Sequence, residues 1–217
     1  MSARTPIRSG ALVGALLALG LLALGLAGCV ARLEQVTDLK QLRPNEVLLV
    51  GRIVLNPPFG ADERDVNKSA LDPTDTDYKA PVMVLDDRRL VWDGEGMMPR
   101  GDRPEYINQP FGETFFVKTA TRPVYINSTI VYLTQTARRI HFWILDTGMV
   151  VEHVAGDRVV YVGTIRYQRN EFNDLLKVEV LDEYAGARRD VEKRFGKGVK
   201  LVKRLARPVP ETARKKG

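Results

Sequence analysis

Two histidines are the side chains of this sequence whose spacing most suggests a metal site. His141 and His153 are the only histidines, and they lie on neighbouring predicted strands on either side of Asp146-Thr147-Gly148. If the chain makes a tight hairpin there, the two imidazoles lie roughly opposite each other and could share a metal ion. Two ligands without a third nearby are a weak signal. Ordinary strand residues are therefore the favoured interpretation.

An acidic loop is the second candidate for metal binding. Residues 60–79 have no periodic apolar face and are rich in Asp, Thr, Ser and Pro, as long loops are. Carboxylate oxygens suit calcium, but the spacing lacks the pattern of an EF-hand loop, which favours a solvated loop. A small-ligand or metal-binding protein that uses the histidines or loop 62–77 stays open as the alternative function. The carboxylates concerned are those of Asp62, Glu63, Asp65, Asp72, Asp75 and Asp77.

Sequence motifs of catalysis are missing from the chain. There is no G-x-S-x-G, P-loop, GxGxxG or H-E-x-x-H pattern, and no Ser, His and acid cluster that suggests a nucleophilic triad. We therefore expect a protein that is not an enzyme, has no cofactor and does not bind nucleic acid.

The single cysteine, Cys29, ends an apolar N-terminal run. Arg4 and Arg8 precede an uncharged stretch of Leu, Ala, Gly and Val over residues 11–27, and the run closes as Leu26-Ala27-Gly28-Cys29. This pattern favours a signal peptide over an uncleaved membrane anchor. The last four residues resemble the lipobox of bacterial lipoproteins. That resemblance implies a diacylglyceryl group on the Cys29 thiol, cleavage between Gly28 and Cys29, and acylation of the new amino group.

The implied lipid predicts where the protein resides. One acyl chain holds a protein only marginally on a bilayer and two or more hold it stably, so the product should stay on its membrane. In Gram-negative members of the family an aspartate after the cysteine tends to retain the protein in the inner membrane, whereas Val30 follows here. We therefore expect a lipid-anchored protein at the periplasmic face of the outer membrane. With Cys29 acylated, no thiol remains for a disulfide or a thiolate metal site.

Short β-branched and aromatic runs dominate the remainder of the chain. They begin with residues 46–55 and continue, at roughly ten-residue spacing, through 82–85, 89–92, 113–118, 123–134, 139–145, 149–154, 158–167 and 175–182. Nine such runs without intervening helical patterns predict an all-β fold, an antiparallel β-sandwich. Residues 183–195 alone have helical spacing, with Val191 and Phe195 on an apolar face, Asp182 as a cap and Gly196 as a stop.

These elements predict four parts of the chain. Residues 1–28 form the signal peptide, 29–44 a polar tether, 45–196 the β-sandwich and 197–217 a basic C-terminal tail. The adjacent aromatic pairs Phe115-Phe116 and Phe142-Trp143 must place one ring on each face of a sheet, so one ring of each pair is a hint of an exposed binding surface.

A second resemblance concerns the fold. The segments GETFFVKTATRPVYINS from Gly112, VYVGTIRY from Val160 and VEVLDEYAGARRDVEKRFG resemble small bacterial lipoproteins that have a transthyretin-like or carboxypeptidase-regulatory-like β-sandwich. The likeness covers roughly half of the mature chain. It implies the sandwich fold and no catalytic residue.

The basic tail accounts for the positive charge of the whole chain. The formal net charge is +6, yet residues 193–217 contain ten Lys or Arg and one Glu. A solvated tail is the simplest interpretation, and docking on an anionic envelope lipid or polymer is the functional one. We expect a non-enzymatic role in binding or assembly with an envelope partner. The residues proposed to contact an anionic surface are Lys197, Lys200, Lys203, Arg204, Arg207, Arg214, Lys215 and Lys216.

Overall fold

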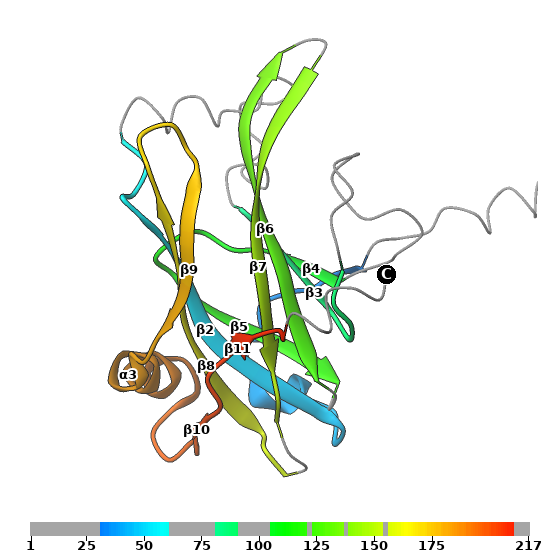
Figure 1. Ribbon diagram of the computed structural model, residues 1–217. Coiled ribbons are helices and arrows are strands. Elements are labelled where there is room, and N and C mark those ends of the chain that lie inside the picture. The colour runs from blue at the N-terminus through cyan, green and yellow to red at the C-terminus, as the bar shows by residue number, and fades with distance from the viewer. Residues whose placement is uncertain are drawn as a thin grey trace, which may run out of the picture. The chain divides into compact units, whose positions relative to one another are not determined.

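A computed structural model describes residues 31–60, 81–90, 105–120, 123–136, 139–153 and 156–210 (Figure 1). For residues 31–32, 132–136 and 139–142 it describes the backbone alone. Most of the described residues are in β-strands, arranged in two sheets with one α-helix, as the sequence predicts. No helix within these ranges is long and apolar enough to cross a membrane.

The first sheet, sheet A, contains the long hairpin formed by β6 and β7. These two strands pair antiparallel, and β3 pairs antiparallel with β6 on the other side. Two-residue strands complete the edges, one near the N-terminus and one near the C-terminus of the described chain. The spatial order is β1 (Ala31–Arg32), β4 (Glu105–Asn108), β3 (Val82–Asp86), β6 (Val124–Thr136), β7 (Arg139–Val151) and β11 (Arg207–Pro208).

The second sheet, sheet B, is mixed rather than antiparallel. Its two central strands, β2 and β8, run parallel, because β8 returns to the sheet after the chain has built the β6–β7 hairpin of sheet A. The expectation of an antiparallel sandwich is therefore corrected: β10 and β1 also pair parallel with their neighbours. The order is β10 (Val202–Lys203), β8 (Val159–Arg169), β2 (Glu46–Asn56) and β5 (Thr114–Ala120), and β9 (Leu175–Leu181) also pairs with β8.

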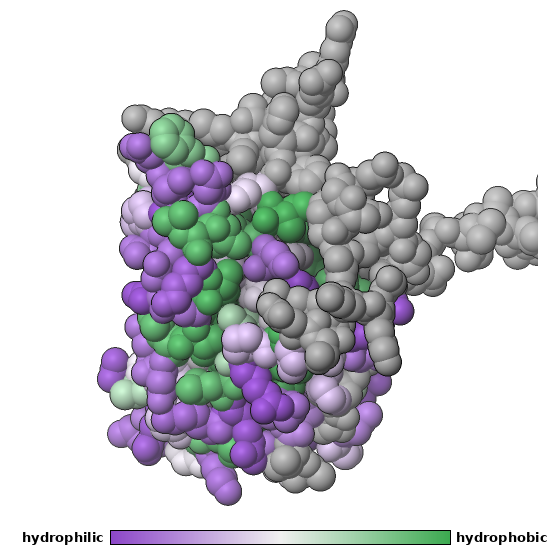
Figure 2. Space-filling view, in the orientation of Figure 1, coloured by the Kyte–Doolittle hydropathy of each residue, from purple (hydrophilic) through white to green (hydrophobic). Residues whose placement is uncertain are grey.

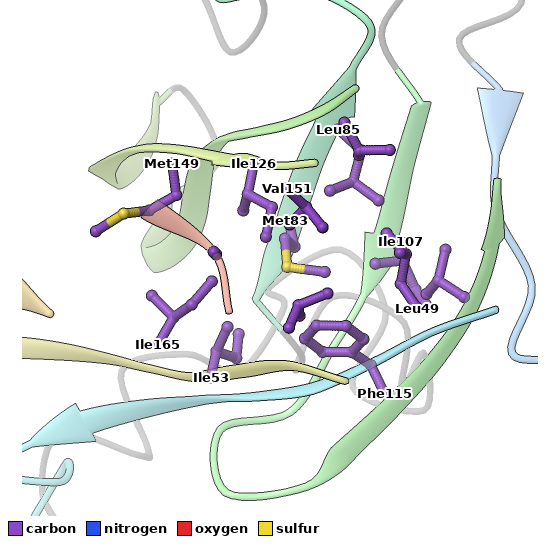
Figure 3. Close-up of a cluster of buried hydrophobic side chains, with 14 of the residues drawn as sticks. Leu49, Ile53, Met83, Leu85, Ile107, Phe115, Ile126, Met149, Val151 and Ile165 are labelled. Carbon is purple, nitrogen blue, oxygen red and sulfur yellow. The ribbon is translucent and has the colours of Figure 1, made fainter. Parts of the chain in front are cut away.

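An apolar core fills the space between the sheets (Figure 3). Alternate residues of each strand point inward and supply the side chains of this core. Burying a Val, Leu, Ile or Phe side chain contributes about 1.5–3 kcal/mol, so this cluster supplies much of the stability of the fold. In Figure 3, side chains from β2, β5 and β8 lie opposite side chains from sheet A, among them Leu49, Ile53, Phe115 and Ile165 opposite Met83, Ile126, Met149 and Val151.

The outer face of sheet B carries a second apolar cluster, which α3 (Tyr184–Phe195) covers. Val191 is fully buried, and the Phe195 ring packs edge-on against Phe116 with 5.4 Å between the ring centroids. This confirms the predicted helix and its stop at Gly196, whose φ is +90°. Phe115 is buried in the core between the sheets and Phe116 is buried beneath α3, so the expected exposed ring of that pair is absent.

The cap of α3 differs from the expectation. Glu183, not Asp182, is the N-cap residue, and its side chain makes no capping hydrogen bond. The Asp182 carboxylate instead accepts a hydrogen bond from the Tyr184 N–H at 3.3 Å, so it still satisfies one amide of the first turn.

The hairpin predicted around residues 146–148 is wrong. These residues lie inside β7, which pairs with β6 along its length, whereas the following strand, β8, belongs to the other sheet. Thr147 and Gly148 together oppose the single residue Asn127, so they form a β-bulge. Gly148 has a φ of +54°, and the positive φ that the sequence suggested for a turn serves this bulge instead.

The expected tether and tail also differ in their described parts. Between residues 31 and 44, the short 3-10 helix η1 (Leu39–Gln41) follows Val36, which is 2% exposed and packs against sheet B. Beyond residue 197, Leu201, Ala206 and Val209 are buried. Among the described residues, packing therefore begins at Leu33 and continues to Val209, beyond both ends of the range 45–196 that the sequence suggested. Single apolar residues within polar segments attach these segments to the sheets.

One predicted strand is missing where the structure can be described. Arg89 and Leu90 were expected to begin a strand, but they form none, and residues 91–92 lie outside the described ranges. Leu90 is buried against Val84 and Ile130 on the outer face of sheet A. The apolar residue that suggested a strand therefore covers the sheet without joining it.

Candidate functional site

A polar pocket lies between the outer face of sheet B and the first turns of α3. Its volume is about 520 Å³, within the range of about 300–1,000 Å³ usual for small-molecule sites. It lies beside the apolar cluster that holds α3 on the sheet, so rigid elements position its walls. Its lining residues are Gly51, Arg52, Thr114, Tyr161, Thr164, Asp182, Glu183, Tyr184, Ala185, Gly186, Ala187, Arg189, Asp190 and Lys203.

The floor of the pocket is a row of side chains across three strands. Thr164 of β8 pairs with Arg52 of β2, which in turn pairs with Thr114 of β5. Residues that pair in register lie on the same face of a sheet, so these three side chains stand together beside α3. Lys203 of β10 pairs with Tyr161 of β8 and begins a second row.

A β-bulge between Tyr161 and Thr164 places both residues on the pocket side. Val50 pairs with Tyr161 and Gly51 pairs with Gly163, so β8 carries one extra residue. Gly163 has a φ of +102°, and a Cβ atom there would lie 2.4 Å from Val180 Cγ1. Only glycine fits this conformation and this space. Bulges of this kind redirect side chains, which explains why two residues three apart share one face.

Arg52 connects the sheet to the helix. Its Nη2 atom donates to Thr114 Oγ1 at 3.2 Å and to the Asp190 carboxylate at 3.3 Å, and Thr114 Oγ1 donates to the same carboxylate at 2.5 Å. Arg52 Nη1 lies 4.0 Å from Glu183 Oε2, which also accepts a hydrogen bond from Thr164 Oγ1 at 2.7 Å. Arg52 thus holds the Asp190 carboxylate of α3 closely and the carboxylate of the N-cap residue Glu183 loosely.

A separate ion pair closes the β10 side of the pocket. Lys203 Nζ lies 2.6 Å from Asp182 Oδ2. Their hydrogen bond lowers the pKa of Asp182 and raises the pKa of Lys203, so both groups stay charged at neutral pH. The same ammonium lies 5.3 Å from the centre of the Tyr184 ring, a cation–π distance.

Tyr161 joins the floor to the start of α3. Its hydroxyl accepts a hydrogen bond from the Glu183 N–H at 2.6 Å and donates to the Leu181 carbonyl at 3.3 Å. Desolvation by burial raises the pKa of this hydroxyl. The Tyr161 and Tyr184 rings pack edge to face with 5.7 Å between their centroids and form an aromatic wall.

Arg189 is the pocket cation that lies outside this network. Within the described residues its guanidinium makes no hydrogen bond or ion pair, while the neighbouring Arg188 pairs with Glu192 one turn further along α3. The pocket therefore presents one arginine whose charge no carboxylate of the described residues neutralises.

The histidines predicted as shared metal ligands are not brought together. His141 lies within β7 opposite Thr134, and His153 follows the other end of the same strand. Twelve residues of extended chain separate them by roughly 40 Å. No group of three or more His, Cys, Asp or Glu among the described residues is arranged to hold a metal ion. Loop 62–77 lies outside those residues, as do Gly28 and Cys29.

The basic residues of the tail are partly neutralised. Lys203 pairs with Asp182, Arg204 pairs with Asp157 at 3.1 Å, and Arg207 pairs with Glu152. Lys197 and Lys200 are exposed. Arg214, Lys215 and Lys216 lie outside the described residues. Docking on an anionic surface stays a prediction, in which Lys197 and Lys200 are tail cations that pair with no carboxylate of the residues that the structure describes.

The pocket was not predicted from the sequence, although two residues in the sequence indicate it. Arg52 is the one charge inside the apolar run of residues 47–55, and Thr164 interrupts a similar run in β8. A lone polar residue in a strand that is apolar on both faces indicates that some local partner is polar. The identity of that partner depends on strand register, which the sequence does not reveal.

Comparison with known proteins returned no match: neither a family model, nor a curated protein, nor a solved structure is significantly similar to this chain.

Proposed function

We propose that the chain is a lipid-anchored, non-enzymatic binding protein at the periplasmic face of the outer membrane, and that the pocket beside α3 is its ligand site. The observation that carries the binding role is the pocket itself, about 520 Å³ in volume and lined by charged, hydroxyl and aromatic side chains from five elements. Ligand sites typically combine such concavity with a few positioned polar groups.

The state of the charged groups favours binding over catalysis. A general acid or base works best with a pKa near the operating pH. In this pocket the hydrogen bond between Asp182 and Lys203 lowers the pKa of Asp182 and raises the pKa of Lys203, so both move away from neutral pH. The Asp190 carboxylate accepts hydrogen bonds from Arg52 and Thr114. Groups held in this way recognise a ligand by charge and are poorly suited to exchange protons with it.

The membrane location rests on the lipobox-like Leu26-Ala27-Gly28-Cys29. Replacing Cys29 with Ser should abolish labelling with radioactive palmitate and the cleavage before residue 29. The native protein should be labelled and should sediment with outer membranes in a density gradient. Undiminished labelling of Cys29→Ser would contradict the anchor.

The kinship with transthyretin-like lipoproteins is part of the same proposal. Two facing sheets and one C-terminal helix support it, while the parallel pairing of β2 with β8 is a departure from an antiparallel sandwich.

A pocket-filling substitution tests the binding role. Ala185 is exposed and lines the pocket, so Ala185→Trp should occupy it, whereas Lys193→Trp places the same ring on the last turn of α3. Native protein and Lys193→Trp, purified in detergent, should retain the same small molecules from an envelope extract, and Ala185→Trp should lose them, as native mass spectrometry would show. Equal retention by all three proteins would contradict a ligand site here.

A further inference from the structure

Two opposite charges in the pocket are left over when its ion pairs are matched. Lys203 neutralises Asp182, and Arg52 neutralises Asp190. Arg189 has no acidic partner among the described residues, and Glu183 has only Arg52 at 4.0 Å, already engaged by Asp190. The Glu183 side chain is 50% exposed, and its Oε1 atom accepts no hydrogen bond from the described residues. The pocket thus offers one available cation and one available anion.

This charge balance selects the class of ligand. Three carboxylates line the pocket, so a phosphate monoester, which carries about −1.5 to −2 charges at neutral pH, would meet repulsion that a single free arginine does not offset. A simple cation would meet Arg52, Arg189 and Lys203. A molecule that carries one carboxylate and one ammonium matches both free groups without a net charge.

The separation of the two free groups sets the size of that molecule. Glu183 precedes the first turn of α3 and Arg189 lies in the second turn, six residues later, which corresponds to roughly 9 Å along the helix axis. The ammonium and carboxylate of a single α-amino acid are attached to the same carbon, whereas those of a short peptide lie several bonds further apart. The spacing therefore favours a peptide of two or three residues.

We infer that the pocket binds a short peptide with free termini, its ammonium group at Glu183 and its carboxylate at Arg189. The Tyr161 and Tyr184 rings form the wall beside the peptide, and the hydroxyls of Thr114 and Thr164 lie on the floor beneath it. This inference rests on the proposed binding role and specifies its ligand.

Calorimetric titration of the full chain in detergent micelles with trialanine tests the inference. Blocking either end removes one charge, so N-acetyl-trialanine and trialanine amide should each bind at least about tenfold more weakly, as expected for loss of a charge-assisted hydrogen bond. Free alanine should bind more weakly than trialanine, because it cannot span both groups. If alanine bound as tightly as trialanine, the ligand would be an amino acid and the inferred length would be wrong.

Arg189→Gln and its neighbour Arg188→Gln form a matched pair. Arg189→Gln should weaken trialanine about tenfold and leave the affinity for trialanine amide unchanged, since the amide has no carboxylate to lose. Arg188→Gln, which breaks only the pair with Glu192, should bind like the native protein. Equal affinity for capped and free peptides, an unaffected Arg189→Gln, or no trialanine binding by the native chain would each overturn the peptide inference. The binding role itself fails only if Ala185→Trp retains the same molecules from the envelope extract as the native protein does.

Discussion

Two tyrosines of β8, six residues apart, end in polar clusters on opposite faces of the same sheet. On the inner face, the Tyr167 hydroxyl lies 2.8 Å from Thr129 Oγ1 and 2.6 Å from Thr147 Oγ1, and all three residues are buried. On the outer face, Tyr161 reaches the charged pocket beside α3. One cluster is neutral and closed, whereas the other is charged and open.

The difference separates a polar group that holds the fold from one that is available to a ligand. The three inner hydroxyls come from both sheets and form hydrogen bonds with one another. Thr147 Oγ1 can also donate to the Leu145 carbonyl at 3.3 Å, so none of the three hydroxyls lacks a partner. A buried polar group without a partner costs stability, so this cluster favours one alignment of the two sheets. The outer cluster leaves Arg189 without a partner among the described residues and leaves the Glu183 carboxylate with one hydrogen bond from Thr164 and only a distant arginine, Arg52, at 4.0 Å. Stability alone does not require this arrangement.

A third region resembles neither cluster. The turn between β8 and β9 carries Phe172, 76% exposed, and β9 begins near Leu176, 63% exposed. Figure 2 shows hydrophobic surface gathered over β9, in contrast to the mainly hydrophilic surface over α3. The pocket therefore belongs to the polar side of the molecule.

The β-bulge at Gly163 lies in β8 between Tyr161 and Tyr167, the tyrosines of the two clusters. Substitution there should lower the stability of the fold more than any other change considered below. Gly163→Ala combines a positive φ, which costs about 1–3 kcal/mol, with a Cβ atom 2.4 Å from Val180 Cγ1, an overpacking that costs about 1–3 kcal/mol more. We expect the free energy of unfolding, measured with denaturant, to fall by about 2–6 kcal/mol. Gly156→Ala, with a φ of +92° and no atom within 4 Å of the added carbon, is the control and should lose only the backbone part. Equal losses would show that the bulge is not tightly packed.

Removing single hydroxyls compares the clusters directly. Tyr167→Phe leaves Thr129 and Thr147 without their shared partner in a closed site, so the free energy of unfolding should fall by about 1–3 kcal/mol. Tyr161→Phe should cost about 0.5–1.5 kcal/mol, because water in the open pocket can replace the lost hydroxyl for the Glu183 N–H. A larger loss for Tyr161→Phe, measured by urea unfolding, would reverse the assignment of the two roles.

Alkaline pH should weaken the closed cluster. Desolvation raises the pKa of Tyr167 from 10.0 to about 12, so its contribution to stability is complete below pH 10 and is lost as the pH rises toward 12. Two pKa units correspond to about 3 kcal/mol. Urea unfolding at pH 9, 10 and 11 should therefore show a steeper decline for the native protein than for Tyr167→Phe. Parallel declines would mean that Tyr167 ionises equally easily in both states.

The smallest effect on stability should come from the open cluster. Arg189→Gln removes an exposed charge that has no partner among the described residues, so unfolding should change by less than about 0.5 kcal/mol. Thermal unfolding without peptide measures this. A clear loss of stability would mean that Arg189 supports the fold and is not held available for a ligand.

Local sequence patterns predicted most strands and the helix, but they did not predict which strands pair with each other. The run of residues 46–55 is β-branched and apolar, and α3 has a helical apolar face ending at Gly196, so both could be predicted. The pairing of β2 with β8 joins residues more than a hundred positions apart, and no local pattern encodes it. Gly148 indicated a positive φ correctly, but a bulge and a hairpin turn both use one.

Strand pairing also explains why the pocket could not be predicted from the sequence. Arg52, Thr114 and Thr164 come from three strands and meet only because β5, β2 and β8 pair in one register. Their types are visible in the sequence, whereas a shift of one residue would turn each side chain to the other face. The two histidines show the opposite error: the sequence suggested that they lie close together, but this depended on a hairpin that the chain does not form.

Nuclear magnetic resonance of the ¹⁵N-labelled full chain in micelles, with increasing trialanine, tests the ligand site most directly. We expect the amide signals of Gly51, Thr114, Thr164 and Gly186 to shift together with one affinity, because these residues line the pocket, while Thr129 and Thr147 stay unchanged. Arg189→Gln should reduce those shifts and Arg188→Gln should preserve them. Shifts confined to β9 and the turn around Phe172, or no shifts at all, would contradict a peptide site beside α3.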